Sequence, residues 1–255
     1  YYDSGTKKDE LIIDQKKKEI VRKKEIKKIN VIATFILPKS KPEVYKKIET
    51  VQKSKILKKK DFEKAKIIFE NISKRKWSTA LKQTKRVKDK DFKDLVQWIY
   101  LKELSNSASF TDYKNFISRN GNYPRIGRLQ YLAEKKINLR TNNPITILSW
   151  FNEYPPVSGY GRLRLAEAKL SLRDNNGVIK LVKDGWTDAR LSSSEIKYFR
   201  KKFKDILNSE DHIKRADYLA WNRKYWDLKR MLRYLPKDQR ALYNARQILM
   251  SNSYG

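Results

Sequence analysis

The stretch Ser109-Phe-Thr-Asp-Tyr-Lys-Asn-Phe-Ile117 contains the pattern that decides the fold. Its apolar residues, Phe110, Tyr113, Phe116 and Ile117, fall at helical spacing and therefore share one face of a helix. Ser109 stands before the first of them, where a hydroxyl can accept a hydrogen bond from a free N–H of the first turn. The stretch therefore predicts a capped, amphipathic helix.

The same pattern recurs along the chain from Asp61 onward. Asp61 precedes the stripe that begins at Phe62, and Asp91 precedes the stripe that begins at Phe92. Both aspartates are therefore expected to cap helices. The apolar stripes begin near residues 62, 77, 92, 110, 129, 145, 163, 178, 196, 213, 226 and 242. Within these stripes, Trp98 and Trp221 are expected to be largely buried.

Successive stripes begin 13 to 19 residues apart, which fits helices of about 12 residues joined by short loops. Two helices then make a unit of about 33 residues, the length of helix–turn–helix repeats. The sequence thus predicts an all-α protein, a right-handed α-superhelix (solenoid) of antiparallel helix pairs. Gly and Pro together number only 15 of the 255 residues, too few for a barrel or sandwich of many short strands.

The first part of the chain differs from the rest. Lysines alternate with Ile and Val over residues 16–29, which predicts a strongly basic amphipathic helix, and Pro38 and Pro42 then predict a bend. A Lys-rich helical pattern resumes over Val44–Lys60. We expect residues 1–42 to form an N-terminal extension and residues 43–255 to form the superhelical domain.

Composition excludes several classes of site. The chain has 60 Lys and Arg against 29 Asp and Glu, a formal charge of +31, with no Cys and a single His. Zinc ribbons, iron–sulfur clusters and Cys–His nucleophile pairs are thereby excluded, and no metal or cofactor is expected. No apolar run approaches the roughly 18 residues of a membrane span. The lysines spread over nearly every predicted helix, so a solvated surface is the simplest explanation of the charge, with polyanion binding as the alternative.

Few residues suggest catalysis. Ser158–Gly161 (Ser-Gly-Tyr-Gly) lacks the preceding strand and third glycine of a dinucleotide loop, and is expected to be a turn before a helix at Leu163–Leu172. His212 follows Asp211 near a helix start, so a capping or packing role is expected. The remaining candidates are carboxylates in Lys/Arg-rich helices, for which ion pairs are expected: Glu103, Glu134, Glu153 and Glu167.

Residues from about 77 to 250 resemble the N-terminal superhelical domain of the soluble lytic murein transglycosylases. The strongest parts run from Gly159-Tyr160-Gly161 to Leu165-Ala166-Glu167 and from Asp211-His212 to Arg215. The other matching residues are Trp77, Ala80, Leu81, Val96–Trp98, Leu101, Ser109, Phe110, Tyr113, Phe116, Ile117, Asn120, Tyr123, Pro124, Ala133, Glu134, Trp150, Phe151, Pro156, Trp186, Leu191, Ser192, Phe199, Phe203, Leu207, Leu219, Trp221, Leu232, Arg240, Ala245 and Arg246.

The chain departs from the family in several places. Tyr123 stands before Pro124 where the family has Trp, and residues 1–60 are more Lys-rich than the family leads one to expect. Arg173-Asp174-Asn175 stands where the family often has a helix-closing Gly, and Asn is expected to supply the left-handed residue there. No Glu is followed by Ser, so the catalytic Glu-Ser motif is missing, and with it the lysozyme-like catalytic domain. No catalytic, metal, cofactor or substrate-binding residue can be assigned from the resemblance, and the chain is expected to be inactive alone.

The resemblance implies a scaffold role in a periplasmic enzyme that cleaves peptidoglycan. In that reaction a catalytic Glu would protonate the glycosidic oxygen, and the sugar's own 6-hydroxyl would attack to give a 1,6-anhydro product without metal or cofactor. The superhelix would gather peptidoglycan strands on a basic surface. Two alternatives stay open: a basic helical-repeat protein that binds nucleic acid, and a helical adaptor for another protein. Under the scaffold hypothesis, nucleic acid is expected to bind only non-specifically and at low salt.

Overall fold

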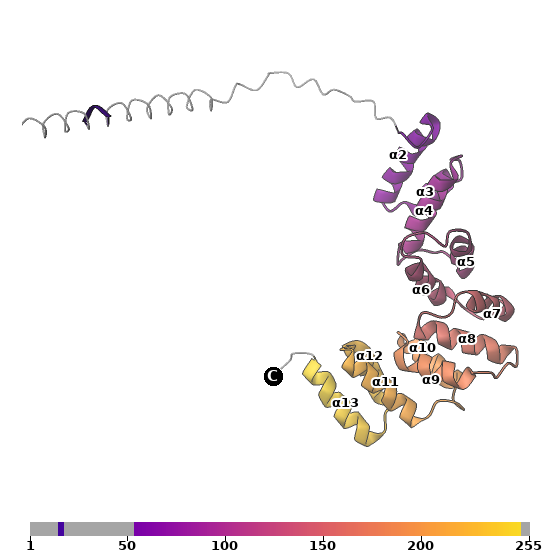
Figure 1. Ribbon diagram of the computed structural model, residues 1–255. Coiled ribbons are helices and arrows are strands. Elements are labelled where there is room, and N and C mark those ends of the chain that lie inside the picture. Colours follow the sequence, from indigo (N-terminus) through magenta and orange to yellow (C-terminus); the bar gives the residue numbers. More distant parts are fainter. Residues whose placement is uncertain (1–14, 18–53, 251–255) are drawn as a thin grey trace, which may run out of the picture. The chain divides into compact units, whose positions relative to one another are not determined.

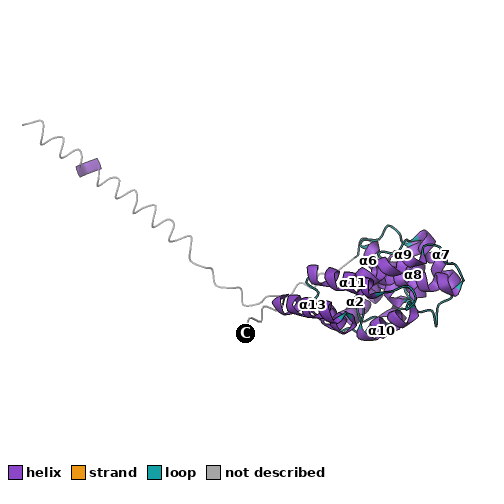
Figure 2. Ribbon diagram, turned by 90° about the horizontal axis from the view of Figure 1, so that it is seen from below, coloured by secondary structure: helices purple, strands orange, loops and turns teal. Residues whose placement is uncertain are grey.

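The computed structural model describes residues 15–17 and 54–250 (Figure 1). The chain divides into two units, residues 1–52 and 53–255, and the description below concerns the second unit. Its described residues contain only helices and loops, without a strand (Figure 2). The helices are α2 (Lys59–Ser73), α3 (Trp77–Thr84), α4 (Lys90–Lys102), α5 (Phe110–Arg119), α6 (Ile126–Lys136), α7 (Pro144–Glu153), α8 (Gly159–Ser171), α9 (Val178–Asp188), α10 (Ser193–Lys202), α11 (Ser209–Trp221), α12 (Tyr225–Met231), the 3-10 helix η1 (Leu232–Tyr234) and α13 (Lys237–Met250).

The prediction of an all-α fold is confirmed over these residues. Each of the twelve predicted stripes lies in one of the twelve α-helices from α2 to α13, and no helix begins more than five residues from the stripe that predicted it. Every pair of α-helices with extensive contact lies one or two helices apart in chain order, such as α8 with α9 and α9 with α11. Hydrophobic periodicity locates these helices correctly because each buries one face on its near neighbours.

The predicted caps are right at one position and wrong at two. Ser109 caps α5 in a reciprocal capping box with Asp112. The cap of α4 is Asp89 rather than Asp91, which lies in the first turn. Asp61 lies inside the first turn of α2, where it is buried and its Oδ2 accepts hydrogen bonds from the backbone N–H groups of Lys88 and Asp89, each at 3.1 Å. Asp61 therefore joins α2 to the loop before α4 instead of capping its own helix.

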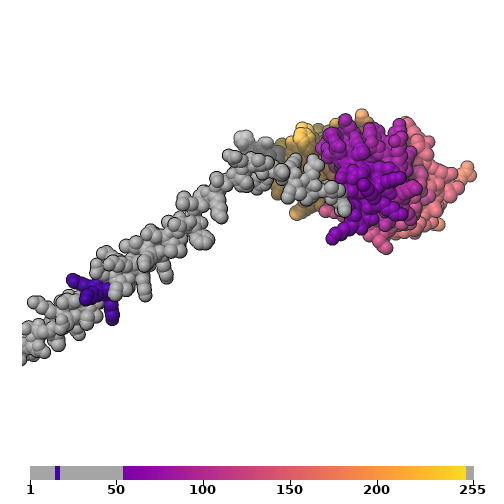
Figure 3. Space-filling view, turned by 90° about the horizontal axis from the view of Figure 1, so that it is seen from above, coloured from indigo at the N-terminus to yellow at the C-terminus, as the bar shows by residue number. Residues whose placement is uncertain are grey.

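The core forms three successive clusters. The first joins α2, α3 and α4 around Ile68 and Val96, and Figure 3 shows the surface that these helices form, in purple. The second extends from Leu101 at the end of α4 to α8, and the third extends from α8 to α13. Helices α4 and α8 each contribute buried residues to two clusters, because their apolar residues occupy two faces.

Two glycines bring α8 and α9 together. A Cβ at Gly159 would lie 2.7 Å from the carbonyl oxygen of Gly185, and one at Gly185 would lie 2.8 Å from the carbonyl oxygen of Gly159. Only hydrogen fits at either Cα, so the two backbones approach more closely than larger residues would permit. This close crossing explains why Ser158–Gly161 carries glycines without being a nucleotide loop.

The expected burial of two tryptophans is not what the structure shows. Trp221 is 74% exposed at the end of α11, and Trp98 is only half-buried, with its indole N–H donating to the carbonyl of Pro124 at 3.0 Å. Trp150 and Trp186 are instead the buried tryptophans of the second and third clusters. The prediction fails at Trp221 because the buried residues of α11, among them Arg215, Ala216 and Leu219, lie on the opposite face of the helix.

All four non-glycine residues with positive φ among the described residues are arginines: Arg75, Arg125, Arg173 and Arg223. Three of them follow the ends of α2, α8 and α11, in the position that usually holds Gly. After α8 the left-handed residue is Arg173, with φ of 60°, and not Asn175 as expected. Asp174 N–H then donates to the Lys169 carbonyl at 2.9 Å, which closes the helix end.

The predictions for the beginning of the chain lie mostly outside the described residues. This holds for the extension over residues 1–42, the bend at Pro38 and Pro42, and the start of the superhelical domain at residue 43. Only 54–60 of the predicted helical stretch Val44–Lys60 can be compared, and residues 54–58 are not helical. There the Ser54 hydroxyl accepts hydrogen bonds from the backbone N–H groups of Ile56 and Leu57, and this turn replaces a helix.

Candidate binding groove

Ser158 lies at a helix start, as the sequence indicated, but the helix begins at Gly159 rather than at Leu163. The Ser158 hydroxyl accepts a hydrogen bond from the backbone N–H of Gly161 at 3.0 Å. A Cβ on Gly161 would lie 2.4 Å from the Glu134 side-chain carbon Cδ. The glycine therefore makes room for a carboxylate that enters from α6.

Glu134 is fully buried and held by hydrogen bonds, not by the ion pair expected from its sequence context. Its Oε1 accepts from the Val157 backbone N–H at 2.6 Å, and its Oε2 accepts from the Ser158 hydroxyl. Burial raises the pKa of this carboxyl despite these hydrogen bonds. Because both oxygens bind the turn before α8, Glu134 joins α6 to α8, and no described pocket includes it.

Glu167 does form the expected ion pair, 2.7 Å from Arg164 Nη1, and is buried. Its other oxygen accepts from the Tyr198 hydroxyl of α10, and Arg164 also donates to the Tyr160 hydroxyl at 2.8 Å. Glu167 therefore connects α8 to α10. The other two candidates, Glu103 and Glu153, are exposed and form no ion pair with any residue in the described ranges.

His212 has the packing role that the sequence indicated. It lies buried against the Trp186 ring, with ring centroids 5.4 Å apart, and its Nε2 accepts from Arg200 Nε at 3.3 Å. Burial, together with the positive charge of Arg200, lowers its pKa to about 4. Arg215, also fully buried, donates to the carbonyl oxygens of Trp186 and Ala189 and so satisfies the end of α9.

A large hollow lies elsewhere on the surface, lined by residues of α6, α10 and α12 and of the loops before α10 and α12. Its volume is about 540 Å³, and we call it the basic groove. It is lined by Tyr131, Lys135, Arg190, Leu191, Ser192, Glu195, Arg223, Lys224, Tyr225, Trp226, Asp227 and Arg230.

The groove has five cationic side chains and two carboxylates, a formal excess of three positive charges. Both carboxylates have partners within the protein. Glu195 accepts from the Ser192 N–H at 2.7 Å in the capping box of α10, and Asp227 pairs with Arg230. Arg190, Arg223 and Lys224 are exposed and form no ion pair with a described residue, so they remain available to an anionic ligand.

Lys135 forms the base of the groove. Its ammonium lies 3.9 Å from the centre of the Tyr160 ring and donates to the Arg190 carbonyl at 2.5 Å. Burial lowers its pKa, and the nearby charges of Arg190 and Arg164 act in the same direction. Lys135 thus fixes the loop that presents Arg190.

Aromatic rings lie beside the cations. Trp226 is 66% exposed and packs edge-to-face on Tyr225, with ring centroids 4.9 Å apart. Tyr131 lines the groove from α6, with Arg128 over its ring at 5.1 Å. A smaller hollow of about 210 Å³ shares Glu195 with the groove and adds Arg140, Arg164 and Tyr198. The combined surface can hold carboxylates or phosphates with its cations and flat apolar faces with its rings.

Sequence analysis did not find this groove. Its cations come from loops and helix ends that lie far apart in the chain, and the even spread of lysines concealed them. A usable signal does exist, since Arg223-Lys224-Tyr225-Trp226 combines two cations with two aromatics between helices.

The described residues include no group of three or more His, Asp or Glu side chains placed to hold a metal ion. Nor does any helix among them combine the length and the hydropathy needed to cross a membrane. The chain matches no family model, no curated protein and no solved structure.

Proposed function

We propose that this chain is the superhelical scaffold domain of a soluble lytic murein transglycosylase, and that it holds peptidoglycan strands in the basic groove. The observation that carries the proposal is the groove itself, which unpaired Arg190, Arg223 and Lys224 line together with the exposed ring of Trp226. Peptidoglycan offers matching chemistry, because its stem peptides carry carboxylates and its sugar rings have apolar faces.

The roles of the residues behind the resemblance support the same proposal. Gly159, Gly161, Glu134, Glu167 and Arg215 all lie at contacts between helices. Contacts restricted to near neighbours in chain order are also typical of a solenoid, the right-handed α-superhelix of antiparallel pairs that the sequence predicts. A scaffold role accounts for residues that serve helix packing rather than chemistry.

The groove would concentrate strands, not cleave them. Attraction between exposed charges is screened within about 8 Å at physiological salt, so each contact adds little and several must act together. The family reaction, 1,6-anhydro bond formation with a catalytic Glu, would then take place in a lysozyme-like domain. The proposal also implies a periplasmic location, where peptidoglycan is found.

Co-sedimentation with purified sacculi tests the proposal. The triple variant Arg190→Gln/Arg223→Gln/Lys224→Gln removes three groove charges, while Lys180→Gln/Lys201→Gln/Lys202→Gln removes three exposed charges outside it. At about 150 mM salt, we expect the groove variant to bind sacculi about tenfold more weakly than the wild type, because each lost charge contact at an exposed surface contributes only modestly to affinity. The control variant should bind as the wild type does. Equal losses in both variants would show that binding follows total charge and would contradict a specific groove.

Nucleic acid is the second candidate, since Arg and exposed aromatic rings also bind phosphates and bases. Competition at about 150 mM salt between sacculi and a mixed pool of single- and double-stranded oligonucleotides distinguishes the two. Non-specific contacts give dissociation constants of about 10⁻⁴–10⁻⁶ M, so tighter or sequence-selective oligonucleotide binding would overturn the peptidoglycan proposal. Sacculus binding that persists in excess oligonucleotide would support it.

A further inference from the structure

The outer side of α13 is apolar. The helix packs on α11, α12 and η1, with Tyr243 and Gln247 buried on its inner side. Leu242, Ala245 and Leu249 recur at helical spacing on the other side, where the two leucines are 53% and 61% exposed. A helix with apolar residues on both sides is typically buried on both sides, so this outer side lacks a covering element among the described residues.

Trp221 extends this apolar surface. Its ring lies exposed at the end of α11, and the guanidinium group of Arg246 is 5.3 Å from the ring centre. Arg246 follows Leu242 by one helical turn, so the indole lies on the Leu242 side of α13. We call Trp221, Leu242, Ala245 and Leu249 together the α13 face.

Cations border the α13 face. Lys237 and Arg240 are exposed at the beginning of α13, and Lys214 is exposed two turns before Trp221 on the same side of α11. None of these three cations forms an ion pair with a described residue. Asp238 is the one acidic residue of α13. The border therefore has a net positive charge that can interact with an anionic surface.

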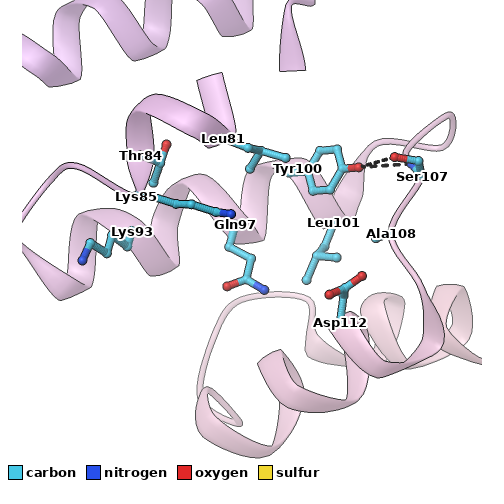
Figure 4. Close-up of a pocket in the computed structure, with 10 residues that line it drawn as sticks. All are labelled: Leu81, Thr84, Lys85, Lys93, Gln97, Tyr100, Leu101, Ser107, Ala108 and Asp112. Atoms are coloured by element: carbon cyan, nitrogen blue, oxygen red, sulfur yellow. Dashed lines mark hydrogen bonds between the residues drawn. The ribbon is translucent and has the colours of Figure 1, made fainter. Parts of the chain in front are cut away.

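This combination distinguishes the α13 face from the pocket of about 450 Å³ where α3, α4 and α5 meet (Figure 4). That pocket also has an apolar floor, at the buried Leu101, but in Figure 4 the Lys93 ammonium points away from Lys85 and Gln97. Its polar groups therefore do not converge on one ligand. The leucines and cations of α13 lie along a single helix and can contact one extended surface together.

The charge and its distribution indicate what covers the α13 face. A second copy of the chain is disfavoured, because each copy has a formal charge of +31. A helix of another protein would need carboxylates at fixed positions, whereas the cations here come from two helices and follow no regular spacing. A lipid surface with anionic headgroups suits all these features. Its diffuse negative charge attracts scattered cations, and the boundary between headgroups and acyl chains accommodates leucine and tryptophan side chains.

We propose that the α13 face docks on an anionic lipid surface. The helix would lie in the plane of that surface without crossing it, with Leu242 and Leu249 at the acyl boundary and Trp221 among the headgroups. Lys214, Lys237 and Arg240 would contact lipid phosphates. The α13 face shares no residue with the basic groove, and this proposal does not depend on the function proposed for the groove.

Co-sedimentation of the full chain with lipid vesicles tests the proposal at about 150 mM salt. The vesicles contain phosphatidylglycerol and phosphatidylcholine in equal parts. Leu242→Gln/Leu249→Gln removes apolar groups of the α13 face without changing the charge, and Ile145→Gln/Ile179→Gln removes two similarly exposed isoleucines, each 62% exposed, on α7 and α9. We expect the α13 variant to bind vesicles about tenfold more weakly, because the lost contacts scale with buried apolar area, and the control to bind as the wild type does. Equal binding by the two variants would show that charge alone drives the association and would overturn the proposal.

Two further measurements distinguish docking from other effects of the leucine substitutions. Vesicles should shift the fluorescence of wild-type tryptophan to shorter wavelength, and this shift should be smaller in Trp221→Phe, whereas an equal shift in the two proteins would place Trp221 in water and contradict docking. Matching urea unfolding curves establish that the variants are folded. Sedimentation velocity without lipid should find the wild type monomeric, and a dimer that is lost in Leu242→Gln/Leu249→Gln would assign the α13 face to a second copy and overturn the proposal.

Discussion

At the scale of single residues, the four left-handed arginines are the most unusual feature. A left-handed conformation costs a residue with a Cβ about 1–2 kcal/mol, yet Arg75, Arg173 and Arg223 occupy helix ends where Gly would avoid this cost. Arg223 differs from the other two because it also lines the basic groove. At that position the backbone conformation favours Gly, whereas the proposed binding of sacculi requires the arginine side chain.

This conflict gives a prediction about two variants. Arg173→Gly and Arg223→Gly should each raise the free energy of unfolding by about 0.5–1 kcal/mol, because relief of strain exceeds the greater flexibility of Gly in the unfolded chain. Only Arg223→Gly should weaken binding to sacculi. Denaturant unfolding and co-sedimentation measure the two effects. Destabilisation by Arg173→Gly would show that the arginine side chain makes contacts that outweigh the strain.

His212 gives the second prediction at this scale. Its pKa is about 4 in the folded protein against an ordinary 6.5, because burial and the positive charges of Arg200 and Arg215 outweigh the opposing effect of Asp211. The folded state therefore favours the neutral ring. The stabilisation is fully present above pH 6.5 and is lost as the pH falls toward 4, by about 3 kcal/mol in total.

Comparison with His212→Gln isolates this contribution, because the carboxylates of the protein titrate in both proteins. Urea unfolding at several pH values should show the wild type losing about 3 kcal/mol more than the variant between pH 7 and pH 4. If the free energy of unfolding fell with pH equally in the two proteins, protonation of His212 would not destabilise the folded state, and the prediction would be wrong.

At the scale of helices, the contacts of α8 depend on small residues. The Glu134 carboxylate occupies the space beside Gly161, so Gly161→Ala should lower the free energy of unfolding by about 1–3 kcal/mol through overpacking. Gly127 provides the control, because it also lies in a helix but a Cβ there would meet nothing within 4 Å. Gly127→Ala should stabilise the protein by up to about 1 kcal/mol. Thermal unfolding measures both, and a neutral Gly161→Ala would show that Glu134 can move aside.

The helices also show how far sequence reasoning reaches. The positions of all twelve α-helices followed from hydrophobic periodicity, because burial of one face is a local property of each segment. Features that depend on tertiary contacts did not follow. Asp61 was expected to cap its own helix and instead binds the loop before α4, and Glu134 was expected to form an ion pair and instead binds the turn before α8.

The candidate site was still less accessible to prediction. Lys135, Arg190 and Arg223 line one groove although they come from α6 and from the loops before α10 and α12, and no spacing in the sequence encodes this. The exposure of Trp221 was also missed, because the aromatic residue was assigned to the apolar stripe although it lies opposite the buried face of α11. Sequence analysis therefore identified the helices, whereas the candidate groove became visible only in the folded structure.

At the scale of the whole unit, the three clusters are linked by two helices, α4 and α8, each of which has buried residues in two clusters. The cluster of α2, α3 and α4 has the fewest buried residues, so its local unfolding should need the least free energy. Amide hydrogen exchange measured by mass spectrometry should find α2 and α3 exchanging first and α8 among the last. Exchange at one common rate throughout α2–α13 would contradict this order.

Because α8 has buried residues in two clusters, a substitution that destabilises one cluster can also destabilise the other. A destabilising substitution at Leu165 or Ala168 of α8 should first disrupt packing in the second cluster. A substitution at Leu163 or Ala166 should first disrupt packing in the third cluster. Because the same backbone supports both faces, melting of α8 from either side removes support from the other. Loss of α8 should therefore destabilise both clusters within residues 101–250, which are joined by α8 and by the partly buried Leu181 of α9.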